Sequence, residues 1–470
     1  MSGFSFATQL IYVLAASCFV LGLHLMNNPA SARRGNQFST AGMVIAVATT
    51  LALIAHAGVI SATGWIVMLA GALVGGGIGL YAARTVQMTA MPQLVSMFNA
   101  VGGGAAALVG IHDYIRLAAA ATGPAESITV TTLLDVIIGS VTFAGSIIAA
   151  GKLQGVITSA PVTFPGARAV NLLLAAAGLA AGGYVISTPS LAALWIVVVA
   201  SLAFGVLMVM PIGGADMPVV ISLLNAFTGT AVAMAGFVIG NWALIIAGAL
   251  VGASGGILTK LMADAMNRSI GNIIVGGFGT GDSAVAAVTG AGASVKAIAA
   301  DDAAIQLAYA SKVIIVPGYG LAAAQAQHEA AELADLLESR GVDVSYAIHP
   351  VAGRMPGHMN VLLAEANVPY PLLKEMEEIN PEFARADVAL VIGANDVTNP
   401  AARRPGNDIS GMPILDVDQA KSVIVVKRSM GTGYAGMENE LYFDPRTSMY
   451  FADAKKAMAE LTAAVKTLVG

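Results

Sequence analysis

The sequence predicts a multi-span α-helical membrane domain followed by an α/β domain with a doubly wound parallel sheet. Apolar residues make up 57% of the chain and charged residues only 11%, well below the roughly 25% of soluble domains. The charged residues are concentrated after about residue 265, where short apolar runs begin to alternate with helical patterns. We therefore expect a transmembrane domain over 1–265, a linker over 266–300 and a soluble domain over 301–470.

The membrane half contains about nine stretches of the roughly 20 apolar residues that a helix needs to cross the hydrocarbon core. The first, Phe4–Met26, lacks a preceding basic region and a clear cleavage site, so we interpret it as a retained helix. Small residues let membrane helices approach closely, so the glycines of Gly71–Gly77 and Gly102–Gly104 are predicted to pack helices together. The expected spans are 6–26, 40–60, 64–83, 92–112, 130–151, 168–187, 191–210, 216–239 and 241–262.

The basic residues of this half predict its orientation. If the N-terminus lies outside, nearly all of them fall in loops on the inside, and Arg116 is the clear exception. An odd number of spans then places 301–470 in the cytoplasm. The inside residues are Arg33, Arg34, Arg84, Lys152, Arg168, Lys260 and Arg268.

Composition excludes several classes of site. The single cysteine, Cys18, excludes an internal disulfide framework and a cysteine metal cluster, and we expect no metal site. The net charge of -5 gives no reason to expect a nucleic-acid partner.

Polar residues within the spans are functional candidates, because an ionisable group in hydrocarbon costs several kcal/mol. His56 and Asp135 stand alone in their spans, and for these we favour a hydrogen-bonded packing role. Asp216 follows Gly213 at a helix start broken by glycine and proline, and Asn225 lies deeper in the same span. Such an arrangement predicts the entrance to a proton path.

The stretch Met266–Ala300 mixes Gly, Ala, Ser and Thr with few large apolar residues, which is typical of a linker. It includes Gly276–Gly281, which superficially resembles a phosphate loop. No Lys-Ser/Thr follows it, and its glycine spacing fits neither nucleotide motif, so we interpret it as flexible linker.

The soluble half shows alternating strand and helix patterns, which predict a parallel sheet with helices on its faces. Helices are expected over Leu321–Ser339, Gly357–Ala366, Pro371–Ile379 and Met449–Leu468. Strands are expected over Val313–Val316, Val342–Ile348, Val388–Ile392, Pro413–Leu415, Ser422–Lys427 and Leu441–Phe443.

Ligands of such sheets bind at the carboxyl ends of the strands. The first strand ends in Gly318 and Gly320, with Ala323 at the third position of a Rossmann-type dinucleotide turn. Glycines there let the backbone approach a pyrophosphate, although a plain strand-to-helix turn is an equal alternative. Other strands lead into His349–Arg354, Gly393–Asp396 and Lys427–Ser429.

The choice of cofactor depends on the end of the Val342–Ile348 strand. An NAD site usually has an acid there for the ribose 2′-hydroxyl, and this chain offers His349 and Arg354 instead. This favours NADP(H), and the basic residues of Lys427–Ser429 are a second place for the 2′-phosphate. The alternatives are that His349 and Arg354 belong to a structural loop and that Lys427 and Arg428 form a solvated strand end. The glycine-rich segment Gly431–Gly436 is predicted to close over a bound nucleotide.

These motifs together resemble the β subunit of the proton-translocating nicotinamide nucleotide transhydrogenase over nearly the whole chain. The strongest matches are Pro317–Gly320, Ile348–Arg354 with Pro356–Val361, Gly393–Asp396 with Asn399–Ala401, and Lys427–Met430 with Gly433–Gly436. Gly213–Pro218 and Met266–Ser269 match in or beside the membrane half.

The resemblance implies hydride transfer between NAD(H) and NADP(H) while protons cross a bacterial inner membrane. It implies NADP(H) on this chain, NAD(H) on a partner α subunit with further membrane helices, and an α2β2-type assembly in the lipid bilayer. The nucleotide would lie reversed on its sheet, with Lys427, Arg428 and Ser429 at the 2′-phosphate, and the loops at Asp408–Pro413 and Tyr434 would move. The implied cofactor ligands are Gly318, Tyr319, Gly320, Ala323, His349, Val351, Ala352, Gly353, Arg354, Gly393, Ala394, Asn395, Asp396, Lys427, Arg428, Ser429, Gly433, Tyr434 and Ala435.

One departure from the family concerns the proton path, for which we expect Asn99, Asp216 and Asn225. Some members carry a histidine where this chain has Asn99, and asparagine does not titrate. The proton-binding group then belongs to the partner's membrane helices, which we favour, or to His56 or Asp216 here.

Hydride transfer is the cofactors' own chemistry, so no catalytic side chain is expected, and coupling to the membrane must be conformational. Asp396 and the loops at Asp408–Pro413 and Tyr434 are the candidates for sensing this conformational change. The alternative function is a secondary transporter or channel gated by a nucleotide-sensing cytoplasmic domain. A membrane-anchored reductase would leave the predicted spans unexplained.

Overall fold

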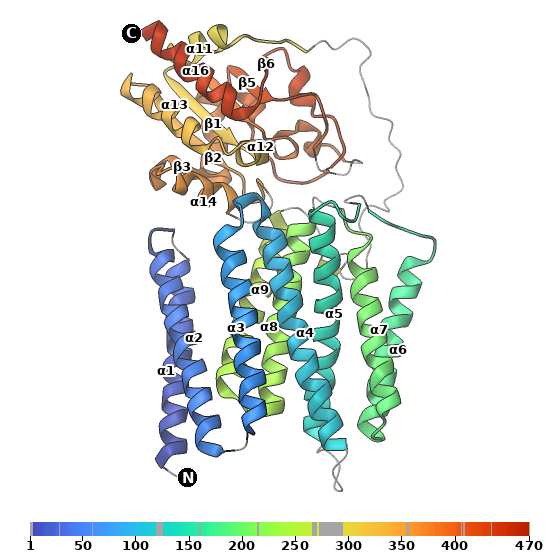
Figure 1. The fold of residues 1–470 in the computed structure, drawn as a ribbon. Helices are drawn as coiled ribbons and strands as arrows, with labels where there is room; N and C mark the ends of the chain where they lie inside the picture. Colours follow the sequence, from blue (N-terminus) through green and yellow to red (C-terminus); the bar gives the residue numbers. More distant parts are fainter. Residues whose placement is uncertain are drawn as a thin grey trace.

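Figure 1 shows a computed structural model in which a bundle of long helices carries a sheet domain at one end. The predicted linker 266–300 lies mostly outside the described residues, as do Gly276–Gly281 and Met266–Ser269. The structure describes residues 3–27, 29–58, 60–118, 126–158, 161–213, 216–265, 270–271, 295–353, 357–405, 407, 409–433 and 435–469.

Nine helices within these ranges are long and apolar enough to cross a membrane. The prediction of nine spans is confirmed, although the second helix begins at Pro29 rather than near residue 40. The helices are α1 (Gly3–Met26), α2 (Pro29–Ala57), α3 (Ala62–Thr85), α4 (Met91–Ala118), α5 (Glu126–Leu153), α6 (Ala167–Ser187), α7 (Leu191–Val209), α8 (Met217–Ile239) and α9 (Trp242–Ala265), with a 3-10 turn, η1 (Met88–Ala90), before α4.

Small residues allow close helix crossings, as between α4 and α5. A β-carbon on Gly139 would lie 2.5 Å from the carbonyl oxygen of Gly103, so neither helix could approach as closely with larger residues. The prediction that the glycines of Gly71–Gly77 pack helices together is wrong within this chain. No residue of α3 is buried, and a β-carbon on Gly71, Gly75, Gly76 or Gly77 would meet nothing within 4 Å.

The sheet has six parallel strands in the order β3-β2-β1-β4-β5-β6, which confirms the doubly wound α/β prediction. Two predicted strands are wrong. Residues 413–415 form no strand, and Leu441–Phe443 lies in a 3-10 turn, η8 (Glu440–Phe443). The strands are β1 (Lys312–Pro317), β2 (Asp343–Ile348), β3 (Leu373–Glu375), β4 (Val388–Ile392), β5 (Ser422–Lys427) and β6 (Thr447–Phe451).

Two apolar layers cover the sheet. One contains α11 (Ala300–Ala308), α13 (Gln327–Ser339), α14 (His358–Glu365) and α16 (Ala454–Val469), and its core includes Leu307, Leu333 and Met458. The other contains α15 (Met376–Ile379) and several 3-10 turns around Phe383.

The predicted helices of this domain needed three corrections. The helix expected over Leu321–Ser339 is split into α12 (Tyr319–Ala323) and α13, because Gln325 adopts a left-handed φ of 51°. The segment Pro371–Ile379 contains the short strand β3 before α15. The helix expected from Met449 begins only at Ala454, after β6.

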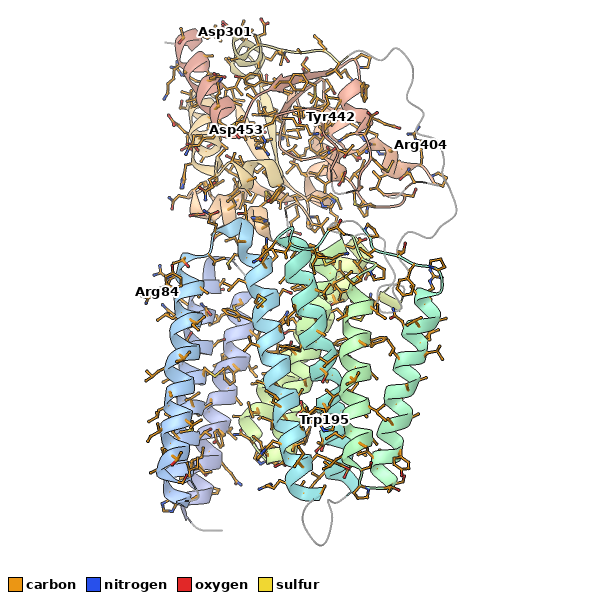
Figure 2. The ribbon with its side chains drawn as sticks, turned by 45° about the vertical axis from the view of Figure 1, so that its right-hand side comes forward. Arg84, Trp195, Asp301, Arg404, Tyr442 and Asp453 are labelled. Carbon is orange, nitrogen blue, oxygen red and sulfur yellow. The ribbon has the colours of Figure 1, made fainter. Side chains whose placement is uncertain are left out.

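The sheet domain meets the helices through α12, which contacts η1. Because α12 follows the carboxyl end of β1, that edge of the sheet faces the bundle. Figure 2 shows Arg84 at the same end of the bundle and Trp195 toward the far end.

Candidate functional site

The candidate site lies where the strand order changes direction, between the carboxyl ends of β1 and β4. In open parallel sheets, ligands bind in the crevice at this point. The loops after β1 and β4 lie against each other here. The N–H of Gly318 donates to Ile392 O at 2.9 Å, and that of Gly320 to Gly393 O at 3.0 Å.

These glycines are required by the contact between the two loops. A β-carbon on Gly318 would lie 2.3 Å from the α-carbon of Ala394, and one on Gly320 would lie 2.6 Å from that of Gly393. Gly393 itself has a φ of 65°. The glycines therefore allow the β1 and β4 loops to pack together. Helix α12 has only five residues and therefore lacks the large dipole of a long helix.

The loop after β4 holds the glycine-rich segment over the site. Asp396 Oδ2 accepts a hydrogen bond from the N–H of Ala435 at 3.1 Å. Gly433 packs so closely on this carboxyl that a β-carbon would lie 2.4 Å from Oδ1. The neighbouring Asn395 accepts from the hydroxyl of Tyr442 at 3.0 Å, which fixes the loop.

The end of β5 carries the basic residues. Lys427 donates to Gly431 O and lies 5.1 Å from the centre of the Tyr442 ring. Burial holds the pKa of Lys427 below its usual value, and the charge of Asp396 partly opposes this shift. Arg428 and Ser429 are exposed, and Arg428 makes no hydrogen bond or ion pair with the described residues. Arg428 is therefore available for an anionic ligand.

His349, at the end of β2, is occupied by backbone contacts. It is buried, its Nε2 lies 2.8 Å from Pro413 O, and its Nδ1 accepts from the N–H of Val351 at 3.2 Å. The proton therefore sits on Nε2, and burial lowers the pKa of His349 to about 4. This neutral imidazole joins the β2 loop to the loop before Leu415.

For other predicted ligands, the structure gives the exposure or the backbone conformation but no polar contact of the side chain. Ala352 is buried, Val351 is half-buried and Ala323 is exposed. Gly353 has a φ of 97° and packs on His358. Arg354 and Tyr434 lie outside the described residues, so their predicted roles remain predictions.

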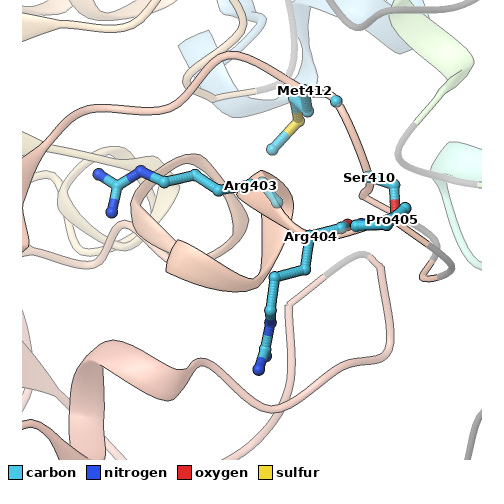
Figure 3. A pocket seen from close by; sticks show the side chains of 7 residues that line it. Arg403, Arg404, Pro405, Ser410 and Met412 are labelled. Carbon is cyan, nitrogen blue, oxygen red and sulfur yellow. The ribbon is translucent and has the colours of Figure 1, made fainter.

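An open hollow is lined by residues 402–405 and 410–412 (Figure 3). Its two arginines point away from each other. Arg403 pairs with Asp416 and Asp418, and Arg404 pairs with Glu440. Because both guanidinium groups are paired, the hollow is a weaker candidate for a phosphate than Arg428.

In the bundle, Asn99 lies on α4 and faces α8. The residue is 4% exposed, its side-chain amide donates to Ile221 O at 3.3 Å, and the Thr228 hydroxyl donates to its backbone carbonyl oxygen. Asn225 follows Ile221 by four residues and is half-buried, so it shares the face of α8 that meets Asn99. Asp216 is buried at the N-cap of α8 without a side-chain cap hydrogen bond.

Two charged residues of α5 depart from the predictions. Lys152, expected in a loop, is fully buried, and its Nζ donates to Met210 O at 2.6 Å and Ile212 O at 2.7 Å, at the end of α7. Asp135 was expected to be a hydrogen-bonded packing residue. It is 0% exposed, and neither carboxyl oxygen accepts a well-formed hydrogen bond in the described chain, although the backbone of Gly110 lies close by.

Two site residues were missed by sequence reasoning. Tyr442 contacts Lys427 and Asn395, and Asn439 donates to Asn395 O at 2.9 Å. Figure 2 shows Tyr442 within the sheet domain. The segment containing Tyr442 matched a strand pattern, and nothing in its sequence indicated a position beside the β4 loop.

Comparison with known proteins gives a consistent result. A family model described as "NAD(P) transhydrogenase beta subunit" matches residues 8–464. Two relatives from Rhodospirillum rubrum, both named "NAD(P) transhydrogenase subunit beta", are 51% identical to this chain over 465 residues. The match covers 97% of this chain and 99% of each relative.

Proposed function

This chain belongs to the NAD(P) transhydrogenase beta subunit family, and from that premise we propose that it binds NADP(H) and couples hydride transfer to proton movement across the membrane. The observation that carries the proposal is the contact between α12 and η1. It joins the turn at the candidate nucleotide site to α4, the helix that bears Asn99.

NADP(H) would occupy the edge formed by β1, β4 and β5. The guanidinium of Arg428, which pairs with none of the described residues, and the hydroxyl of Ser429 would hold the 2′-phosphate, because a planar guanidinium fork suits phosphate oxygens. The β1 and β4 loops would face the pyrophosphate, and the segment containing Ala435 would cover the nucleotide while Asp396 holds it.

The hydride would pass directly between two nicotinamide rings, since the cofactors supply the chemistry. NAD(H) would be bound by a partner alpha subunit, in an α2β2-type assembly. This chain's residues would orient NADP(H) and exclude water. The buried His349 has its ring nitrogens engaged with backbone and need not exchange a proton during the transfer.

The conformational change that couples the membrane helices to the sheet domain would be transmitted through α12, η1 and α4. Protonation in the membrane would shift the sheet domain between a form that exchanges NADP(H) and one that retains it. The path would include Asp216, Asn99 and Asn225, which lie on or before α8 or at its contact with α4. The sheet domain would lie on the cytoplasmic side of the inner membrane of a bacterial cell.

We place the proton-binding group next to Asn99 on the partner's membrane helices, because asparagine does not titrate. If Asn99→Ala abolished proton transport while the partner's membrane histidine could be removed harmlessly, this placement would be wrong.

The test of the function uses vesicles containing this chain and its alpha partner. Reduction of an NAD analogue by NADPH is followed together with the pH of the lumen. We expect both signals together. Reduction without a pH change would indicate a membrane-anchored reductase, and the absence of both would favour a nucleotide-gated transporter.

A further inference from the structure

The contact between α4 and α5, which we call the α4–α5 seam, contains small and polar residues along most of its length. Those on α5 are spaced by three and four residues and therefore share one face of the helix. They are Thr132, Asp135, Gly139, Thr142 and Ser146, and they meet Ser96, Gly103 and Gly110 of α4.

Contacts along the seam establish its order from the sheet-domain end outward. The hydroxyl of Ser96 donates to Ser146 O at 2.8 Å. A β-carbon on Gly103 would lie 2.9 Å from the β-carbon of Thr142. Farthest from the sheet domain, a β-carbon on Gly110 would lie 2.9 Å from Asp135 Oδ2. The carboxyl of Asp135 therefore occupies space that only glycine leaves open.

Apolar residues lie on either side of Asp135 along α5. Leu133 and Val136 belong to a buried cluster drawn from α4, α5, α6 and α7. Asp135 is 0% exposed, and neither of its oxygens accepts a well-formed hydrogen bond from the described residues, although the backbone of Gly110 lies against the carboxyl. A carboxylate ion in such surroundings costs several kcal/mol, so the side chain carries a proton where it lies.

The ionisable groups nearest to this part of the seam are engaged or face outward. Asp113 pairs with Arg116 at 3.1 Å, and Tyr114 accepts a hydrogen bond from the N–H of Ser190. His112 and, on α6, Tyr184 are exposed. Helices α7 and α8 contain no ionisable residue, and the other ionisable residues of α5 and α6 are at helix ends: Glu126, Lys152 and Arg168.

The position of Asp135 complements that of Asn99. Gly110 follows Asn99 by 11 residues on α4, which corresponds to roughly 17 Å along the helix axis. Asn99 lies in the half of α4 that begins at η1, and Asp135 lies in the half remote from the sheet domain. The first residue cannot bind a proton and the second can.

We propose that Asp135 is the proton-binding group in the distal half of the membrane path. It takes up a proton as a carboxylate when the α4–α5 seam opens to the far side, and it releases that proton when the seam opens toward Asn99. The inference rests on the proposed function, and it adds a proton-binding site on this chain to any on the partner.

The test compares Asp135→Asn with Asp113→Asn in vesicles that contain the alpha partner. Asp113 is a matched control, because it lies in the same half of the bundle but is paired. We expect at least a tenfold loss of lumen acidification for Asp135→Asn, and none for Asp113→Asn. Asp135→Glu should restore part of the rate. Gly110→Ala, which crowds the carboxyl, should slow acidification, whereas Gly183→Ala, with nothing within 4 Å, should not.

A second readout keeps the proposal testable if Asp135→Asn fails to assemble. Infrared spectra of the wild-type complex should contain a carbonyl band of a protonated carboxylic acid that changes during turnover, and Asp135→Glu should shift it. Unchanged acidification in Asp135→Asn, or a band that Asp135→Glu leaves unmoved, would overturn the inference. A wild-type complex that transfers hydride without acidification would instead contradict the proposed function.

Discussion

The buried His349 of the sheet domain and the buried Asp135 of the helix bundle differ in their hydrogen bonding. In the sheet domain, the buried His349 is held by backbone contacts, and the half-buried Asn395 and Asp396 accept hydrogen bonds from Tyr442 and Ala435. In the helix bundle, Asn99 and Lys152 are also hydrogen-bonded, whereas Asp135 is as buried as His349 but accepts no well-formed hydrogen bond in the described chain. A satisfied polar group fixes loops around a ligand, whereas an unsatisfied carboxyl gains or loses a proton as its surroundings change.

This difference matches the proposed division of labour. Hydride transfer needs two cofactors held still, and the bonds at the strand ends supply rigidity. Proton transport needs a group with two protonation states, and the α4–α5 seam supplies one. The contact between α12 and η1 joins the rigid site to the helix that lines the seam.

The largest expected effect tests the rigidity of the nucleotide site. Gly320→Ala places a methyl group 2.6 Å from the α-carbon of Gly393, so the two loops must separate. We expect the free energy of unfolding of the sheet domain to fall by about 3 kcal/mol. Gly431→Ala is the control, since its nearest atom would be the Ser429 hydroxyl at 3.5 Å. Equal thermal stability of the two variants would show that the loops are not held closely.

The next effect concerns the one basic side chain at the site that is left without a partner in the described chain. Arg428→Ala should weaken NADPH binding by about 2 kcal/mol, or roughly 30-fold, because a charge-assisted hydrogen bond is lost. Binding of NADH, which lacks the 2′-phosphate, should not change. Arg446→Ala is the control, because Arg446 pairs with Asp444. Calorimetric titration that gives the same NADPH affinity for both variants would remove Arg428 from the site.

The smallest effect tests whether His349 stays neutral. Its folded pKa of about 4 lies below the unfolded value near 6.5, so the unfolded chain binds more protons between these values. The stability that His349 contributes is present above pH 6.5 and is lost as the pH falls toward 4. Between pH 7 and 5.5 we expect a loss of about 1 kcal/mol that His349→Gln removes.

Thermal unfolding at both pH values checks this difference, and the exposed His328 provides the control variant His328→Gln. If His349→Gln kept the full pH dependence of the wild type, the assignment of a neutral, engaged imidazole would be wrong.

Sequence patterns were sufficient for elements that depend on local composition. The nine spans follow from long apolar stretches, and β1, β2, β4 and β5 follow from β-branched runs such as Val313–Val316. The strands β3 and β6 were missed because Leu373–Glu375 and Thr447–Phe451 are short or mixed in polarity. Their extended form depends on pairing with β2 and β5.

The candidate site was only partly predictable, since it depends on contacts between distant segments. Strand ends predicted Gly318, Asp396 and Arg428, because parallel strands end at one edge. The engagement of His349 by Pro413 spans 64 residues, and the sequence has no local signal for it. The surroundings of Asp135 were unpredictable for the same reason, since only the packing of α4 on α5 shows that its carboxyl accepts no well-formed hydrogen bond.

The most direct test of this account measures one turnover of hydride transfer and lumen acidification in the same vesicles, with NADPH at its half-saturating concentration for the wild type. We predict that Asp135→Asn keeps the first burst of hydride transfer from bound NADPH but loses acidification, and that Arg428→Ala loses most of the burst. Wild-type acidification in Asp135→Asn, or loss of both signals in that variant with NADPH still bound, would contradict the separation of the two roles.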